Sequence, residues 1–209
     1  MIYLDNGATS FRKPPAVYRA VRQAMETCAV PIFAYLLVEG WQHTASKMNY
    51  AKRVLGLGLI SEIPYNFAMT GKILDVSSRN PVFGIALCMI ALYFYDLYED
   101  KCFKNTAVKL LVTVAAFLWS NMLKIEYGSA TVLITATLWA FRKNTLYRNF
   151  AGAAATIVCT VMSMYFLAAP MAFMIVHGYD GEKSTNSRTV NYLAYPVILM
   201  AAAIVGFIL

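Results

Sequence analysis

Apolar blocks alternate with short polar clusters along most of this chain. The blocks lie at residues 29–41, 54–69, 81–95, 106–123, 127–141, 150–176 and 190–209. A bilayer core about 30 Å thick requires roughly 20 apolar residues in each crossing helix. The pattern therefore predicts an all-α protein, a polytopic helical membrane protein of about seven transmembrane segments, with a short amino-terminal segment that is typical of soluble proteins.

Two blocks carry features that interrupt a helix. Pro64 lies in the second block, and because proline lacks a backbone N–H we expect it to end or kink that helix. The block at residues 150–176 is too long for one upright span and too short for two. A tilted helix would fit this length, and so would two short helices broken near Ala169 and Pro170.

Composition supports the membrane prediction. Of the 209 residues 59% are hydrophobic and only 14% are charged, whereas soluble domains carry about a quarter charged residues. The net charge of +7 would suggest nucleic acid in a soluble protein, but the bases fall in the loops between apolar blocks. We therefore expect the lipid bilayer and no nucleic acid as a partner. Four scattered cysteines indicate neither a metal site nor a disulfide framework.

The loop charges predict an orientation in the membrane. Residues 42–53, 97–109 and 142–148 are the more basic loops, so the positive-inside rule places them in the cytoplasm of a multi-pass protein of the bacterial cytoplasmic membrane. This places residues 1–28 outside, although that segment is itself basic. We hypothesise that a first span once preceded Ala29 and has been replaced.

The amino-terminal segment differs from the remainder. Tyr3 to Ser10 read YLDNGATS, and Lys13-Pro14 precede an amphipathic helical pattern that includes Val17. This segment resembles the amino terminus of the cysteine desulfurases and related class V aminotransferases, which use pyridoxal phosphate (PLP). No counterpart of their PLP lysine, catalytic cysteine or large domain follows, so we expect neither desulfurase activity nor PLP. The predicted organisation is a grafted fragment at residues 1–28 and a transmembrane domain at residues 29–209.

Ionisable residues in the first two apolar blocks are the candidates for chemistry. Glu39 and His43 are four residues apart, which places them on one face of a continuous helix. A carboxylate that bonds an imidazole fixes its tautomer and raises its basicity, as a general base requires. The alternative is an interfacial pair, with the helix ending at Gly40. Glu62 lies beside Pro64 and would face away from Arg53 on one helix.

A longer set of residues resembles the TraX family. The set comprises Pro31 to Gly40, His43-Thr44, Tyr50, Arg53, Ile60 to Pro64, Tyr127-Gly128, the loop at residues 179–183 and Tyr195-Pro196. TraX proteins are polytopic membrane proteins of conjugation systems. The resemblance implies an acetyltransferase that acts on the amino terminus of pilin, with acetyl-CoA as cosubstrate and no bound cofactor.

The resemblance also implies roles for individual residues. His43 would be the catalytic base, oriented by Glu39, and the remaining candidates for substrate or cosubstrate binding are Arg53, Glu62, Tyr127 and Tyr195. The chain departs from the family in lacking a first span with an Asp-His pair, and in having Ile198 where a histidine is frequent. The alternative is therefore a non-catalytic, degenerate membrane protein that arose by gene fusion. A transporter is the weaker alternative, because we find no repeat symmetry.

Overall fold

The computed structural model describes residues 15–100, 102–178, 194–201 and 204, and these residues form an all-helical bundle. Its elements are α2 (Pro15–His43), α3 (Lys47–Thr70), α4 (Val82–Leu97), α5 (Phe103–Met122), α6 (Gly128–Ala140), α7 (Thr145–Val158), the 3₁₀ helices η1 (Cys159–Val161) and η2 (Met164–Met171), and α8 (Ala172–His177). Residues 194–201 are also helical. Within the described ranges, no helix combines the length and the apolarity needed to cross a membrane.

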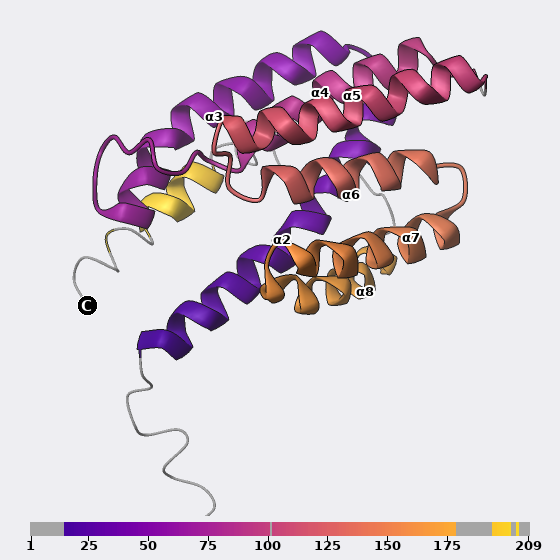
Figure 1. Ribbon diagram of the computed structural model, residues 1–209. Helices are drawn as coiled ribbons and strands as arrows, with labels where there is room; N and C mark the ends of the chain where they lie inside the picture. Colours follow the sequence, from indigo (N-terminus) through magenta and orange to yellow (C-terminus); the bar gives the residue numbers. More distant parts are fainter. Residues whose placement is uncertain (1–14, 101, 179–193, 202–203, 205–209) are drawn as a thin grey trace, which may run out of the picture.

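Helix α6 forms the centre of the bundle. It packs against α4 and α5 on one side and against α7 on the other, and α2 crosses behind it (Figure 1). Eight of its 13 residues are buried, among them Ile134 and Leu138. Close packing of α4 on α6 requires glycine, because a Cβ on Gly84 would lie 3.3 Å from the Cα of Gly128. Helices α2, α4 and α7 thus pack around α6, which forms an apolar core.

Helix α3 continues through Pro64. Its amino terminus is capped by Ser46, whose hydroxyl accepts from the backbone N–H of Asn49 at 3.3 Å. The helix ends at Thr70, where Gly71 takes a left-handed conformation with φ 69°. Proline therefore does not end this helix, which ends at the glycine cap, and a kink at Pro64 stays a prediction.

The block at residues 150–176 is broken, but not where the sequence suggested. Helix α7 begins earlier, at Thr145, and the helical path is interrupted at Ser163, whose backbone is extended (φ −156°, ψ 126°). Pro170 lies inside η2 rather than at a break. Of the two alternatives, the single tilted helix is wrong and the broken segment is correct, but the predicted position of the break near Ala169 and Pro170 is wrong.

Helix α2 is continuous across the boundary that the sequence suggested at residue 28. Thr27 is fully buried, and its hydroxyl lies 2.9 Å from the carbonyl oxygens of both Ala24 and Tyr165. One residue earlier, Glu26 accepts a hydrogen bond of 3.2 Å from the hydroxyl of Tyr127. Residues 26 and 27 thus pack into the bundle. The two-part organisation stays a prediction, and the motif at residues 3–10 and the loop at residues 179–183 lie outside the described residues.

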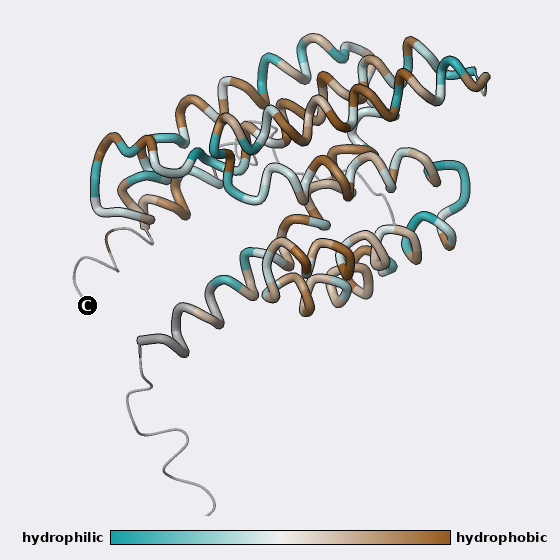
Figure 2. The backbone as a smooth tube through the Cα atoms, in the orientation of Figure 1, coloured by the Kyte–Doolittle hydropathy of each residue, from teal (hydrophilic) through white to brown (hydrophobic). Residues whose placement is uncertain are grey.

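The bundle has one basic end, formed by the loops α2–α3, α4–α5 and α6–α7 and the helix turns beside them. Its described charged residues are Glu39, Lys47, Lys52, Arg53, Asp96, Glu99, Asp100, Lys104, Lys109, Arg142, Lys143 and Arg148. Those of the opposite end are Glu26, Glu62, Lys72, Asp75, Arg79, Lys124 and Glu126. The α6–α7 turn is hydrophilic and the middle of α4 is hydrophobic (Figure 2). The three loops that the sequence marked as basic therefore lie together.

Candidate functional site

A largely buried ion pair joins α2 and α7 at the basic end. The Arg148 side chain is 6% exposed, and its Nη1 donates to Oε1 of Glu39 at 2.7 Å. Its Nη2 donates to the hydroxyl of Tyr35, and its Cζ lies 4.4 Å from the centroid of the Tyr35 ring. We call Tyr35, Glu39, His43 and Arg148 the Arg148 cluster. Its guanidinium fixes the position of the Glu39 carboxylate.

His43 lies at the exposed edge of this cluster. Its Nδ1 is 3.4 Å from Oε2 of Glu39 and 2.9 Å from the Glu39 carbonyl oxygen. The His43 side chain is 76% exposed, whereas that of Glu39 is 24% exposed. Because Nδ1 is engaged, Nε2 is the ring nitrogen that can exchange a proton with a bound substrate. The helix continues past Gly40 to His43, so the predicted helix end at Gly40 is wrong, whereas an interfacial location of the pair stays a prediction.

Buried polar atoms without partners lie in the same turn of α7. Nε of Arg148 and both side-chain polar atoms of Asn149 are buried and have no hydrogen-bond partner among the described residues. Leaving such groups unpaired costs about 1–3 kcal/mol each, so native proteins normally satisfy them with water or a ligand. These three buried atoms therefore mark a polar position within the packed part of α7.

Arg148 was not a candidate in the sequence, where it counted only as one charge of the loop at residues 142–148. Helix α7 begins at Thr145. Asn144 caps its amino terminus, since the Asn144 side chain accepts from the backbone N–H of Tyr147 at 3.2 Å. Within the first turn of this helix, Arg148 contacts Glu39 and Tyr35 of α2. An Asn before an apolar helical pattern was the available signal, but the pairing with Glu39 is a tertiary contact that spacing does not reveal.

Arg53 lies at the basic end but has a different neighbour. Its side chain is exposed, and its Cζ lies 5.9 Å from the ring centroid of Tyr50. Tyr50 in turn packs on α2, because a Cβ placed on Gly40 would lie 2.9 Å from its hydroxyl. The Arg53 guanidinium is thus exposed to solvent near the α2–α3 turn.

A second polar cluster forms at the opposite end around Asn80, which is fully buried. Its backbone N–H donates to Oε2 of Glu62 at 3.2 Å, and its side-chain amide donates to the hydroxyl of Ser61 at 2.8 Å. Its Oδ1 accepts from the Tyr195 hydroxyl at 3.0 Å. We call Ser61, Glu62, Asn80 and Tyr195 the Asn80 cluster. It joins α3, the α3–α4 loop and the helix at residues 194–201.

Tyr127 lies near this cluster, in the turn that leads into α6. Its backbone is left-handed with φ 54°, and its hydroxyl donates to Glu26. The turn is anchored on the α3–α4 loop, since Arg79 donates its N–H to the Lys124 carbonyl at 2.8 Å and accepts from the Glu126 N–H at 3.0 Å. The turn that holds Tyr127 is therefore fixed by backbone pairing.

The six candidate residues thus fall into separate groups. Glu39 and His43 are together at the basic end, and Glu62 and Tyr195 are together in the Asn80 cluster. Glu26 and Glu39 lie thirteen residues apart on α2, and a rise of about 1.5 Å per residue separates the two ends by roughly 20 Å. Among the described residues no group of three or more His, Cys, Asp or Glu is arranged to hold a metal ion.

The fold and these clusters define a class: a helical bundle with an apolar centre and one ion-paired, basic end. In a comparison with family models, the model described as "TraX protein" matches residues 18–206. The chain belongs to the TraX family and is a TraX-like, conjugation-related protein. Searches of curated proteins and of solved structures found no match.

Proposed function

We propose that this chain is a multi-pass membrane acetyltransferase that moves the acetyl group of acetyl-CoA to the amino terminus of a pilin or another peptide. The observation that carries the proposal is the chain of contacts from Arg148 through Glu39 to His43. A buried guanidinium holds a carboxylate, the carboxylate contacts an imidazole, and the imidazole is exposed to substrate. This is the arrangement that a general base requires.

The distribution of side chains supports the membrane part of the proposal. Large apolar residues of the described helices are exposed on the outside of the bundle, including Phe33, Leu36, Ile90, Leu110, Leu111, Val114, Leu118 and Ile157. An exposed apolar surface of this kind suits contact with lipid. The basic end then belongs on the cytoplasmic side of the bacterial membrane, where acetyl-CoA is available.

The proposed reaction is a direct acyl transfer. The amine nitrogen of the acceptor forms a bond to the acetyl carbonyl carbon while Nε2 of His43 accepts the proton that this nitrogen loses. The C–S bond then breaks, and the CoA sulfur leaves with the proton returned from His43. Glu39 keeps Nδ1 engaged throughout, and Arg148 keeps Glu39 in place. Arg53 is the proposed partner of a phosphate of acetyl-CoA or of the oxyanion.

A transfer assay tests the enzyme proposal. Membranes that contain the chain are expected to label a peptide with a free amino terminus from acetyl-labelled CoA, and to leave a peptide with a blocked terminus unlabelled. His43→Ala is expected to abolish the labelling. His177→Ala is the matched control, because His177 is the second of the two histidines and lies at the exposed end of α8.

The orientation is testable through Cys102, which is exposed between α4 and α5 at the basic end, whereas Cys88 and Cys159 are buried. In a Cys28→Ser background, a membrane-impermeant maleimide should label Cys102 only after the cells are permeabilised. Labelling of Cys102 in intact cells would contradict the proposed orientation. Labelling of a chain recovered from the soluble fraction would contradict the membrane proposal.

Two alternatives stay predictions. A non-catalytic product of gene fusion predicts no acetyl transfer in a preparation where an intact relative is active. A transporter predicts uptake of a solute by vesicles that contain the chain, independent of His43.

A further inference from the structure

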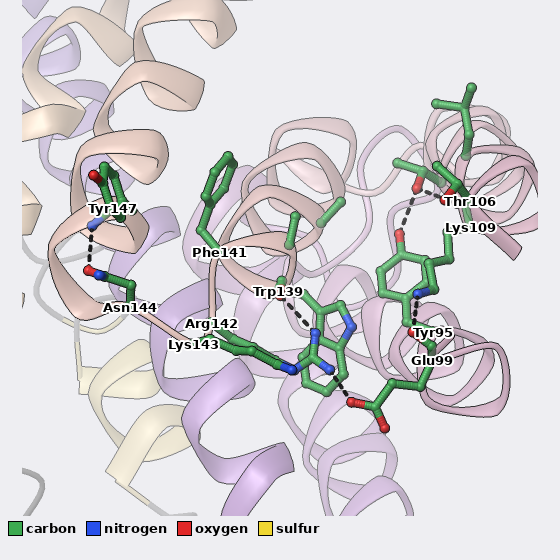
Figure 3. Close-up of a pocket in the computed structure, with 14 residues that line it drawn as sticks. Tyr95, Glu99, Thr106, Lys109, Trp139, Phe141, Arg142, Lys143, Asn144 and Tyr147 are labelled. Carbon is green, nitrogen blue, oxygen red and sulfur yellow. Dashed lines mark hydrogen bonds and ion pairs between the residues drawn. The ribbon is translucent and has the colours of Figure 1, made fainter. Parts of the chain in front are cut away.

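A cavity of about 540 Å³ opens at the basic end between α4, α5 and α6 (Figure 3). Its lining includes three cationic side chains, Lys109, Arg142 and Lys143, and four aromatic ones, Tyr95, Trp139, Phe141 and Tyr147. We call it the α4–α6 pocket. Its volume lies within the range of about 300–1,000 Å³ that is typical of small-molecule sites.

Arg142 is held rigidly in this pocket. Its guanidinium Cζ lies 3.9 Å from the ring centroid of Trp139, and its Nη1 donates to the Trp139 carbonyl at 3.2 Å. The Arg142 side chain is only 17% exposed. A guanidinium fixed in this way is prepared to bind an anion, because little side-chain freedom is lost on binding.

Glu99 contacts two of the cationic side chains that line the pocket, those of Arg142 and Lys109. Its Oε1 lies 2.8 Å from Nη2 of Arg142, and its backbone carbonyl accepts from Nζ of Lys109 at 3.3 Å. The Glu99 side chain is 64% exposed and belongs to the turn between α4 and α5. An exposed ion pair is weak and exchanges readily, so a phosphate with its higher charge can replace this carboxylate.

The aromatic side chains of the lining indicate which kind of phosphorylated ligand the pocket binds. Trp139 is 5% exposed, and its Nε1 is buried without a hydrogen-bond partner among the described residues. The Trp139 ring lines the cavity and packs on Arg142. Aromatic faces beside cationic side chains are the combination that binds nucleotides, since the base stacks and the phosphates pair.

The pocket adjoins the Arg148 cluster. Tyr147 lines the pocket, and the next residue, Arg148, holds Glu39. On the other wall Tyr95 lines the pocket, and the next residue, Asp96, accepts from Nε1 of Trp41 on α2 at 2.9 Å. The pocket and the Arg148 cluster thus lie at the same end of the bundle.

We infer that the α4–α6 pocket binds a phosphorylated adenosine, the nucleotide end of the acetyl donor, with its phosphates on Lys109 and Arg142 and its base against the aromatic lining. The inference rests on the proposed function for the identity of the donor. The phosphate chemistry is shared with the headgroup of an anionic lipid, so the experiment separates the two sources.

Binding of adenosine 3′,5′-bisphosphate and of CoA to the full chain in nanodiscs of zwitterionic lipid, measured by calorimetry, tests the inference. Both probes are expected to bind. Lys109→Ala should weaken binding about tenfold, which is the size expected of one charge-assisted hydrogen bond in a part-exposed site. Lys104→Ala, on the same helix but outside the pocket lining, should change binding less than about twofold. Glu99→Gln should tighten binding, because it removes the competing carboxylate.

Three results would overturn the inference. The first is that neither probe binds. The second is an equal loss of affinity in the Lys109 and Lys104 variants. The third is that phosphatidylglycerol in the discs protects Lys109 from an amine-reactive label while the nucleotides do not, which would assign the pocket to lipid.

The inference and the proposed function fail in different ways. If Lys109→Ala and Lys104→Ala leave the same KM for acetyl-CoA in an active preparation, the pocket assignment is wrong and the enzyme proposal stands. If the probes bind with the expected response to Lys109 but no acetyl is transferred, the nucleotide site stands and the enzyme proposal is wrong. His43→Ala should abolish transfer and leave binding of the probes unchanged.

Discussion

The pairing of Arg148 with Glu39 makes a quantitative prediction about stability. Arg148→Met retains much of the aliphatic packing of the side chain but removes the guanidinium, so the Glu39 carboxylate loses its partner. Breaking a buried ion pair by removing one member costs about 3–5 kcal/mol. Glu39 is 24% exposed and Arg148 is 6% exposed. Because water reaches the carboxylate in part, we expect the low end of the range, about 3 kcal/mol.

The second single variant, which completes a double-mutant cycle with Arg148→Met, is Glu39→Gln. Its amide oxygen can still accept from Arg148, so this change should cost less, about 2 kcal/mol. In the double variant neither charge is left unpaired. The combined loss should therefore be smaller than the sum of the single losses by about 1–3 kcal/mol, as expected for residues in one network.

Thermal unfolding of the purified full chain in detergent measures these differences. For a chain of this length about 1 kcal/mol shifts Tm by roughly 2–4 °C, so Arg148→Met should lower Tm by roughly 6–12 °C. Arg53→Met is the matched control, because Arg53 is exposed, and it should change stability by less than about 0.5 kcal/mol. Equal Tm values for Arg148→Met and Arg53→Met, or strict additivity in the double variant, would refute the reasoning.

Two further predictions concern packing and buried polar groups. Gly152→Ala should destabilise the chain by about 1–3 kcal/mol, because a Cβ there would lie 2.4 Å from Cζ of Phe173. Gly56→Ala is the control, since its Cβ meets nothing within 4 Å, and it should be neutral or stabilising. Equal Tm shifts for the two variants would contradict this. Asn80→Ala should cost about 2–3 kcal/mol because it leaves the groups around it unpaired, and exposed Asn121→Ala should be near neutral; denaturant midpoints that agree within error would contradict the role of the Asn80 cluster.

Much of the fold could be predicted from the sequence because each apolar block is long enough to form one helix that packs its apolar side chains. The block at residues 81–95 corresponds to α4, and the block at residues 127–141 corresponds to α6, with every end within two residues. The break at Ser163 could not be predicted, since neither a proline nor a glycine marks it. It depends on how the segment from Cys159 to Met171 packs on α2 and α7.

The candidate site was predictable only where its residues are close in sequence. Glu39 and His43 were identified because a spacing of four residues is sufficient to place them on one helical face. Arg148 and Asn80 were missed because their partners come from other elements, which spacing does not reveal. Glu62 and Tyr195 were grouped with His43 by resemblance, and the structure places them at the opposite end, because α3 and α2 run in opposite directions from their short connection.

The central claim is that His43, oriented by Glu39, moves the proton in an acetyl transfer. The most direct measurement follows free CoA thiol and acetylated peptide together, using the purified chain, acetyl-labelled CoA and a peptide with a free amino terminus. The account predicts one thiol released for each acetylated amine, with both products lost in His43→Ala and retained in His177→Ala. Thiol release without labelled peptide, or an unchanged rate in His43→Ala, would contradict it.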